Sequence, residues 1–174
     1  MSVLADAQPA ALPADAFLGA YKESDAYVDC FVTRVAGEVS HGDFISAFYT
    51  TWLFKTERLI LRFAASRPST DEEAIELALG TRDRFAAWKV EQRSADQLLL
   101  CDFTGRTRSW LMTVPDPDSD PISTRLYFGS AVVPRIDSIT GTPNLGAGFR
   151  ALLGFHKLYS RLLLRAACAN LQRN

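Results

Sequence analysis

Two side chains that can take part in proton transfer or hydrogen bonding lie one helical turn apart near the C-terminus. His156 and Tyr159 are separated by three positions within residues 149–170, where apolar residues recur at helical spacing. Residues three apart lie on the same face of a helix, so both fall within one otherwise apolar face. A histidine there is either a core residue hydrogen-bonded to a neighbour or a pocket residue that contacts a ligand or transfers a proton.

The helical wheel of residues 149–170 separates an apolar arc from a basic one. The apolar arc contains Leu152, Phe155, Tyr159, Leu162, Leu163 and Ala166. The opposite side carries Arg150, Lys157, Arg161 and Arg165. We therefore predict that Leu152, Tyr159 and Leu163 face a sheet. The basic residues are predicted to form a solvated face and not a nucleic-acid-binding stripe.

Two further candidates lie in a strand expected over residues 106–114. Alternation of side chains along this strand places Arg108 and Trp110 on one face. If Trp110 points at the C-terminal helix, Arg108 does too, and a buried arginine needs an anionic partner. Asp102 on the neighbouring strand could supply it, and so could an acidic ligand. Alternatively, this end of the strand reaches solvent and Arg108 extends to water along its aliphatic stem.

Other residue types narrow the possible chemistry. Trp88 is a strand aromatic for which a structural role is expected, and it is kept as a candidate for the wall of a pocket. Ser109 and Ser130 lack the context of a nucleophile elbow, so serine hydrolase chemistry is not expected. With only His41 and His156 present, no histidine-rich metal site can form. Glycine-rich phosphate-binding loops are also missing from the sequence, so neither a metal nor a cofactor is expected.

The elements that must hold these residues follow from residue periodicity and turn composition. β-Branched and aromatic residues predict strands over residues 27–35, 85–92, 97–103, 106–114 and 124–133. Short turns at 94–96 and 104–105 favour antiparallel hairpins, and residues 134–148 are predicted to be a loop. A strand, then helices, then a run of strands and a final helix indicate an α+β fold with an antiparallel sheet.

Helices are expected between the first two of these strands. Ser40 is a predicted N-cap with Asp43 three residues later, and residues 70–73 begin a short helix that stops at Gly80. The apolar positions shift phase after the first helix, so one straight amphipathic helix cannot satisfy both sets. We therefore predict a break near residues 50–54 and two helices that meet at an angle.

Length and composition favour one domain with an ordinary core. The 174 residues are 48% hydrophobic and 22% charged, with 19 basic and 20 acidic residues. A chain of this size buries most of its apolar surface without cross-links, and its near-zero net charge argues against nucleic-acid binding. Residues 1–20 are predicted to be a flexible N-terminal arm that does not form a convincing signal peptide. Residues 21–174 are predicted to form the single domain.

The three cysteines indicate a reducing environment. Cys30, Cys101 and Cys168 are widely spaced within apolar or aromatic runs and lack metal-binding spacing. We predict three free thiols, which is typical of a cytoplasmic protein. No apolar run is long enough to span a bilayer, so integral membrane association is not expected.

Two short segments and the order of elements resemble known protein families. Residues 79–85 and 154–161 are similar to segments of an uncharacterised bacterial domain-of-unknown-function family. Its members tend to carry a Leu-Gly-x-x-Asp-Arg strand entry and a last helix containing Phe-His-Arg. Phe155 and His156 match that pattern, and Lys157 replaces the arginine.

The order of elements over residues 27–170 resembles the helix-grip fold of the SRPBCC superfamily, which includes START lipid-transfer domains and polyketide cyclases. The resemblance implies a curved antiparallel sheet wrapped around a long C-terminal helix, two short helices in a V, and a cavity. The chain departs from this pattern in two respects. It shows five clear strands where seven are usual, and it lacks a glycine-rich loop between the early strands.

Fold alone does not define function, so three hypotheses follow. The first is binding of a small, largely apolar or amphipathic molecule between the sheet and the C-terminal helix. Its candidate lining is His156, Tyr159, Trp110, Arg108, Asp102 and Trp88. The second is an enzyme of cyclase, hydrolase or dehydratase type in the same cavity, with His156 as acid/base and Tyr159 orienting it. Catalysis needs a second titratable group in hydrogen-bond reach, which the sequence does not show. The third is a non-catalytic module with a solid core that forms a homodimer.

Overall fold

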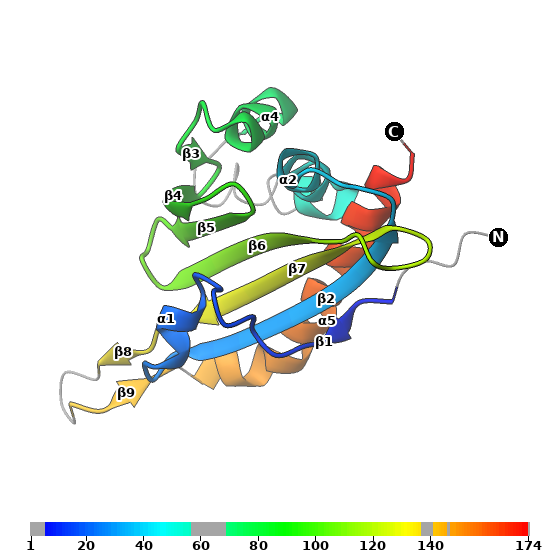
Figure 1. Cartoon of the computed structure of the whole chain (residues 1–174). Helices are drawn as coiled ribbons and strands as arrows, with labels where there is room; N and C mark the ends of the chain where they lie inside the picture. Colours follow the sequence, from blue (N-terminus) through cyan, green and yellow to red (C-terminus); the bar gives the residue numbers. More distant parts are fainter. Residues whose placement is uncertain (1–5, 57–68, 137–140, 146, 174) are drawn as a thin grey trace.

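The computed structural model describes residues 6–56, 69–136, 141–145 and 147–173. Its centre is an antiparallel sheet with the strand order β1-β2-β7-β6-β5-β4-β3 (Figure 1). The strands are β1 (Gln8–Pro9), β2 (Tyr27–Ala36), β3 (Arg84–Phe85), β4 (Trp88–Arg93), β5 (Gln97–Asp102), β6 (Thr107–Asp116) and β7 (Ser123–Val132). The α+β class and the antiparallel sheet predicted from the sequence are therefore confirmed.

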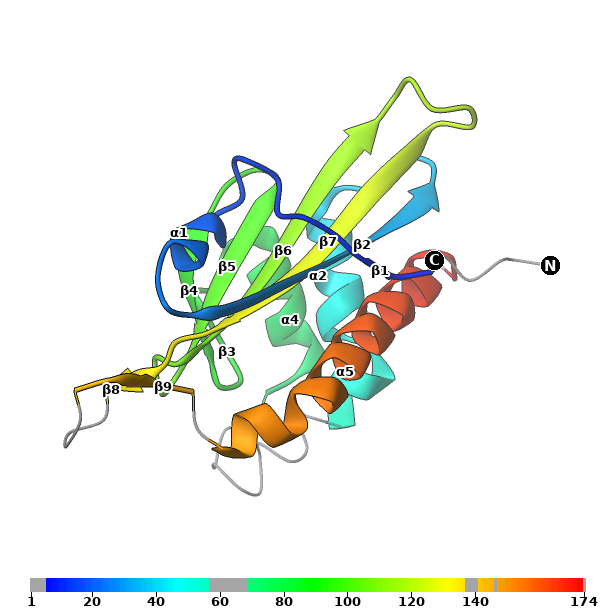
Figure 2. The same ribbon diagram turned by 90° about the horizontal axis from the view of Figure 1, so that it is seen from below.

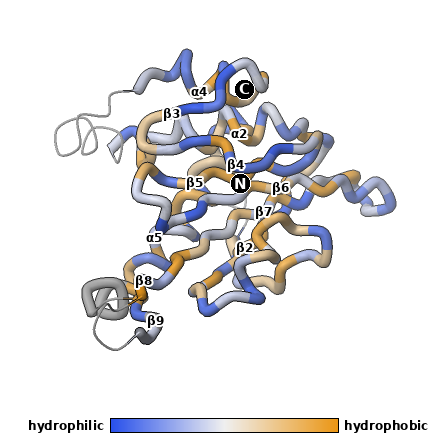
Figure 3. Tube along the Cα trace, turned by 90° about the vertical axis from the view of Figure 1, so that its left-hand side faces the viewer, coloured by the Kyte–Doolittle hydropathy of each residue, from blue (hydrophilic) through white to orange (hydrophobic). Residues whose placement is uncertain are grey.

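Helices α2, α4 and α5 cover one face of the sheet, and most of an N-terminal segment, residues 6–26, which includes α1, crosses the other (Figure 2). The helices are α1 (Gly19–Lys22), α2 (His41–Tyr49), α4 (Asp71–Leu79) and α5 (Ala147–Leu171). The face that contacts α2, α4 and α5 is called the inner face below, and the opposite one the outer face. In Figure 3 the turn between β6 and β7 is hydrophilic.

The predicted helix boundaries are confirmed. The Ser40 side chain accepts a hydrogen bond from the Asp43 backbone N–H at the start of α2, and Thr70 and Glu73 form a reciprocal capping box at the start of α4. Gly80 ends α4 in the left-handed conformation, at φ 77°. Helix α2 ends at Tyr49 and residues 52–56 are helical again, so the chain breaks within the predicted range. The rest of the predicted second helix, and so the angle between the two, lies outside the described residues.

Two predictions about the strands were wrong in detail. The strand expected over residues 85–92 is two strands, because Ala86 has a left-handed φ of 51° and turns β3 back onto β4. The loop expected over residues 134–148 contains a small hairpin, β8 (Arg135–Ile136) and β9 (Pro143–Asn144). With the two-residue strands β1 and β3, the central sheet in the described residues has seven strands, where the sequence predicted five.

An aromatic cluster fills one end of the inner face. Its members are Phe44, Phe48, Tyr49, Phe54, Phe85 and Phe128. The rings of Phe48 and Phe128 lie 4.8 Å apart between centroids, which joins α2 to β7. Each of these side chains is almost completely buried. Burial of this much aromatic surface is a main stabilising contribution to the fold.

The N-terminal segment packs on the outer face. Residues 8–9 pair with β2 at the sheet edge, and Leu18 is fully buried against the backbone of Gly129. A Cβ at Gly129 would lie 2.7 Å from the Leu18 side chain, so the close approach requires glycine. The sequence analysis assigns residues 1–20 to an arm, and the described part of that arm, residues 6–20, covers the sheet.

The buried face of α5 is rotated from the predicted one. Leu163 is buried as predicted and Tyr159 is half-buried, while the Leu152 side chain lies outside the described residues. Phe155 and Leu162, however, are exposed. The inward positions are taken by His156, Ser160, Leu163, Leu164, Ala167 and Cys168. The rotation is possible because His156 finds polar partners on the sheet, so a polar residue replaces an apolar one on the inward face.

The basic side of α5 is only partly solvated. Arg161 donates a hydrogen bond from Nε to the backbone oxygen of Ala7, at 2.9 Å. The Asp6 carboxylate forms ion pairs with both Arg161 and Arg165. The N-terminal segment therefore pairs with part of this basic face, while Lys157 is exposed and Arg161 and Arg165 stay partly exposed.

Two sequence-based expectations concern the whole chain. Cys30, Cys101 and Cys168 are all free thiols, as predicted. Burial raises the pKa of Cys30 to about 12 and that of Cys168 to about 11, so both are unreactive thiols at neutral pH. Within the described ranges, no helix combines the length and apolarity that crossing a membrane requires.

Candidate functional site

The inner face of the sheet changes from apolar to polar along the strands. One row across four strands consists of Phe31, Phe128, Leu111 and Leu98. Two positions along each strand, the next row on the same face consists of Asp29, Ser130, Ser109 and Leu100. The first row packs in the aromatic core. In the second row, Asp29 and Ser130 contact His156 of α5, whereas Ser109 contacts Tyr49 of α2.

A polar cluster of Tyr27, Asp29, Ser130 and His156 joins the sheet to α5. The Asp29 carboxylate accepts hydrogen bonds from the Ser130 backbone N–H, at 3.1 Å, and from the Ser130 hydroxyl, at 2.7 Å. The Tyr27 hydroxyl donates to the other carboxylate oxygen at 3.0 Å, and His156 Nε2 lies 3.3 Å from that same oxygen. Side chains from β2, β7 and α5 therefore converge on one carboxylate.

Asp29 is held as an anion in a buried position. Its side chain is only 8% exposed, and burial alone would raise its pKa. Hydrogen bonds from His156, Ser130 and Tyr27 and the nearby imidazole outweigh burial, so its pKa lies below the usual value. Burial and the neighbouring carboxylate raise the pKa of Tyr27 in turn, which keeps its hydroxyl protonated as a donor.

The hydrogen-bond directions define the tautomer of His156. An ionised carboxylate only accepts, so the Ser130 hydroxyl proton points to Asp29 and the serine oxygen is left as an acceptor. His156 Nε2 lies 2.8 Å from that oxygen and therefore carries a proton. Any proton that His156 exchanges with a ligand or solvent must then move through Nδ1.

This geometry is not that of a serine nucleophile. In a catalytic triad the carboxylate and the serine bind opposite nitrogens of the imidazole. Here Asp29 and Ser130 both face Nε2, and Ser130 gives its proton to Asp29. Ser130 is also only 3% exposed. The arrangement can orient an imidazole, but it cannot activate Ser130, which agrees with the sequence-based expectation.

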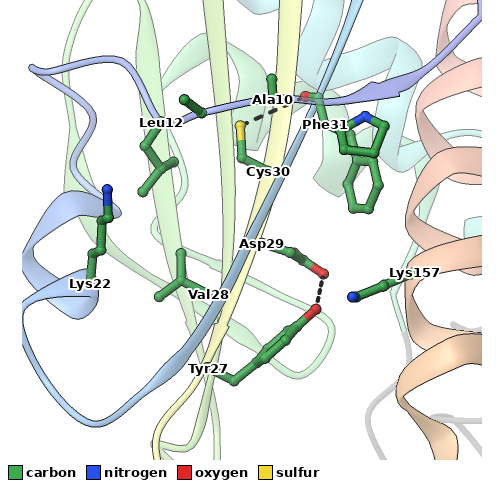
Figure 4. Close-up of a pocket in the computed structure, with 11 residues that line it drawn as sticks. Ala10, Leu12, Lys22, Tyr27, Val28, Asp29, Cys30, Phe31 and Lys157 are labelled. Atoms are coloured by element: carbon green, nitrogen blue, oxygen red, sulfur yellow. Dashed lines mark hydrogen bonds between the residues drawn. The ribbon is translucent and has the colours of Figure 1, made fainter.

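A pocket opens beside the polar cluster at the sheet edge (Figure 4). We call it the edge pocket, and its volume is about 370 Å³. Its lining residues are Pro9, Ala10, Ala11, Leu12, Lys22, Tyr27, Val28, Asp29, Cys30, Phe31 and Lys157. It therefore lies where the N-terminal segment, the first half of β2 and the first half of α5 meet.

The pocket exists because the N-terminal segment leaves the sheet edge early. Strand β1 pairs with β2 only opposite Phe31 and Val32, and the Ala10 backbone N–H then donates to the Cys30 oxygen, at 2.9 Å. Alternate residues of a strand direct their backbone groups to the same edge, so those of Val28 also point toward this side. The segment passes at a distance there, and the gap is closed at its far end by α1.

The structure separates the residues that the sequence analysis grouped into one lining. Trp110 lies on the outer face, where its indole N–H donates to Gln97 Oε1, at 3.0 Å, beneath the N-terminal segment. Arg108 lies on the same outer face and forms an ion pair with Glu91, at 3.0 Å, and a cation–π contact with Tyr21. The expected orientation toward the C-terminal helix was therefore wrong for both residues.

Asp102 and Trp88 lie on the inner face, but three or four strands away from β2. The Asp102 carboxylate accepts hydrogen bonds from the Arg106 and Thr107 backbone N–H groups, at 2.8 and 3.0 Å, and thus stabilises the β5–β6 turn. It is not the partner of Arg108. Trp88 lies opposite Asp102 and packs against the aromatic core.

Tyr159 lies at the margin of the site. Its ring stacks on Phe155, with 6.0 Å between centroids, and it packs partly against the core. The contacts that orient His156 come from Asp29 and Ser130, so the strands have the role that the sequence analysis gave to Tyr159. Of the six predicted lining residues, only His156 belongs to the polar cluster, and none of the six lines the edge pocket.

Sequence reasoning missed Asp29, although the pattern contained a signal. The first strand alternates so that Tyr27, Asp29 and Phe31 share one face, and aspartate is rare within strands. A carboxylate on an otherwise apolar strand face needs donors, which Ser130 and His156 provide. Their pairing depends on the register of β2 with β7, which connects residues about a hundred positions apart.

Comparison of the chain with protein-family models, curated proteins and solved structures finds no match. The described residues contain no group of three or more His, Cys, Asp or Glu side chains arranged to hold a metal ion. The chemistry of the site must therefore be argued from its own residues.

Proposed function

We propose that the protein binds a small, largely apolar molecule in the edge pocket, with the polar part of the ligand beside Tyr27 and Asp29. One observation carries the proposal: a mostly apolar pocket of about 370 Å³ ends at a pre-organised, hydrogen-bonded polar cluster. Small-molecule sites typically have volumes of about 300–1,000 Å³ and few polar groups.

The helix-grip arrangement is part of this proposal. A seven-stranded antiparallel sheet with a long C-terminal helix on one face supports it. In our proposal, the ligand enters between the sheet edge and this helix, and the N-terminal segment forms the outer wall. A cytoplasmic location remains our expectation and is supported by three reduced cysteines.

Native mass spectrometry of the protein purified from its own host tests the proposal. We expect a bound small molecule whose mass adds to that of the chain and disappears under denaturing conditions. The matched control is Ala11→Trp, because Ala11 is exposed at the pocket wall and a tryptophan there fills the pocket without entering the core. Equal retention of the molecule by this variant would contradict binding in the edge pocket.

A second candidate function is acid/base catalysis at the polar cluster beside the edge pocket. The observation that favours it is the carboxylate of Asp29 within hydrogen-bond reach of His156, a second titratable group of the kind that catalysis requires. In this proposal Nδ1 of His156 exchanges the proton and Asp29 orients the ring. Turnover of a co-purified compound that is lost in His156→Gln and kept in Ser130→Ala would support it, since Ser130 is not a nucleophile in this geometry.

The homodimer hypothesis has a different basis. Phe155, Leu158 and Leu162 form an exposed apolar stripe along α5, with 65%, 53% and 41% of each residue accessible. Analytical ultracentrifugation of the wild type and of Phe155→Ser decides this question. A monomer in both proteins would contradict the homodimer.

A further inference from the structure

Three charged residues line the edge pocket, and they differ in charge and in exposure. Asp29 is anionic with a side chain only 8% exposed, whereas Lys22 and Lys157 are cationic and exposed. Figure 4 shows the two lysines entering from α1 and α5, on opposite sides of β2. The net charge of the lining is therefore positive by one unit.

The negative charge of Asp29 is already satisfied by the protein. Each oxygen of a carboxylate accepts about two hydrogen bonds. One oxygen of Asp29 binds the backbone N–H and the hydroxyl of Ser130, and the other binds Tyr27 and His156. The Ser130 backbone N–H, the Ser130 hydroxyl and the Tyr27 hydroxyl therefore stabilise the Asp29 carboxylate, with the His156 imidazole nearby.

The described residues do not balance the positive charges of the two lysines in this way. Among the described residues, neither Lys22 nor Lys157 forms an ion pair or a hydrogen bond, whereas Arg161 and Arg165 on the same helix as Lys157 are paired with Asp6. Both lysines are exposed, so their ammonium groups reach the pocket surface while the apolar residues Leu12, Val28 and Phe31 form the walls.

We infer that the edge pocket selects a small amphipathic molecule that carries one anionic group, a carboxylate, sulfonate or phosphate, on an apolar body. This inference rests on the proposed function and narrows its ligand class. The apolar body fills the space along β2, and the anionic group lies at the pocket surface, in the positive field of Lys22 and Lys157. There it stays partly hydrated, which avoids the cost of burying a charge.

A pair of fluorescent probes tests the inference directly. Anilinonaphthalene sulfonate and phenylnaphthylamine have the same ring system, and only the first carries a sulfonate. We expect wild-type protein to bind the sulfonate more tightly, by about three- to tenfold at low salt, because exposed charge pairs contribute modestly and are screened. Added sodium chloride should weaken binding of the sulfonate and leave the neutral probe unchanged.

Lysine variants test whether the preference for the sulfonate probe arises in the edge pocket. Lys157→Met and Lys22→Met each should weaken binding of the sulfonate by about threefold and leave the neutral probe unchanged. The matched control is Lys89→Met, an exposed lysine on β4 at the far side of the sheet, which should alter neither probe. Ala11→Trp should weaken binding of both probes, because it fills the pocket.

The outcomes separate the inference from the proposed function. Equal affinities for the two probes, both reduced by Ala11→Trp, would overturn the inference and leave the proposed function standing. Binding of the sulfonate that Ala11→Trp does not reduce would place the probe elsewhere, for example on the exposed stripe of α5, and would overturn the inference. If neither probe binds at millimolar concentration, the proposed function fails and the inference fails with it.

Discussion

The two ends of the inner face of the sheet share the same strands and differ in their side chains. At one end, Phe31, Phe128 and Leu111 pack beneath the aromatic residues of α2. At the other, Asp29 and Ser130 hold His156 of α5 through hydrogen bonds beside a pocket. Apolar packing needs no partner of fixed chemistry, whereas a buried carboxylate needs several donors at fixed positions.

This difference indicates a division of roles between the two ends. The aromatic end stabilises the fold because it buries apolar surface. The hydrogen bonds of the polar end fix the orientation of the His156 imidazole. Replacing a buried polar network by packed apolar residues is often neutral or stabilising. The polar end is therefore hard to explain by stability alone, which is consistent with the proposed role in ligand binding.

The largest expected effect lies at the aromatic end. Phe48→Ala should lower the free energy of unfolding by about 3–5 kcal/mol, because a buried ring that contacts Phe44, Tyr49 and Phe128 leaves a cavity. Phe155→Ala is the matched control, since Phe155 is 65% exposed, and it should change stability by less than about 0.5 kcal/mol. Urea denaturation measures both. Similar losses of unfolding free energy in the two variants would contradict the proposed division of roles between the two ends.

The polar end should show a smaller but clear loss. Asp29→Asn should lower the free energy of unfolding by about 2–3 kcal/mol, because the amide replaces one acceptor oxygen with a donor and leaves a buried polar group unsatisfied. Asp25→Asn, at an exposed position before β2, serves as the control and should have almost no effect. An unchanged unfolding midpoint in Asp29→Asn would mean that the cluster does not hold α5 to the sheet.

The pH dependence of stability also distinguishes the polar end from the aromatic end. The pKa of Asp29 is lower in the folded state than its usual value, so its contribution to stability is complete above the unfolded-state pKa of about 4 and is lost as pH falls through the folded-state pKa. The stability difference between wild type and Asp29→Asn should therefore be constant near neutrality and shrink below about pH 4. The loss caused by Phe48→Ala should depend on pH much less. A difference for Asp29→Asn that persists in strong acid would contradict the ionised carboxylate.

The smallest expected effect is at Tyr159. Because this ring is only half-buried and stacks on an exposed phenylalanine, Tyr159→Ala should cost about 1–2 kcal/mol, clearly less than a core aromatic. Thermal melts of Tyr159→Ala and Phe48→Ala under the same conditions test this ranking of stability losses. A loss as large as that of Phe48→Ala would favour a solid core at the start of α5.

The sequence predicted local structure better than it predicted the site. Cap residues such as Ser40, Thr70 and Gly80 act within a few positions, so the ends of α2 and α4 follow from short patterns. The final helix was also predicted, because its length and periodicity are strong. Two-residue strands such as β1 have no periodicity to detect, and they form only when a partner strand is present.

The site depended on which face of each element meets its neighbour. Alternation placed Arg108 and Trp110 together correctly, but it could not tell the inner face from the outer one. The N-terminal segment decided this, because it supplies a second apolar layer with Leu18 and receives Trp110. Likewise, Asp29 and His156 meet only through the tertiary packing of β2 against α5.

A residue-resolved binding measurement tests the central claim most directly. Amide chemical shifts of the protein should be recorded by NMR during titration with anilinonaphthalene sulfonate. Ligand binding in the edge pocket predicts the largest changes at Leu12, Val28 and Cys30, with smaller changes at the far end of the sheet around Val90. Changes confined to Leu158 and Leu162 on the exposed stripe of α5, or no saturable change at all, would contradict the account.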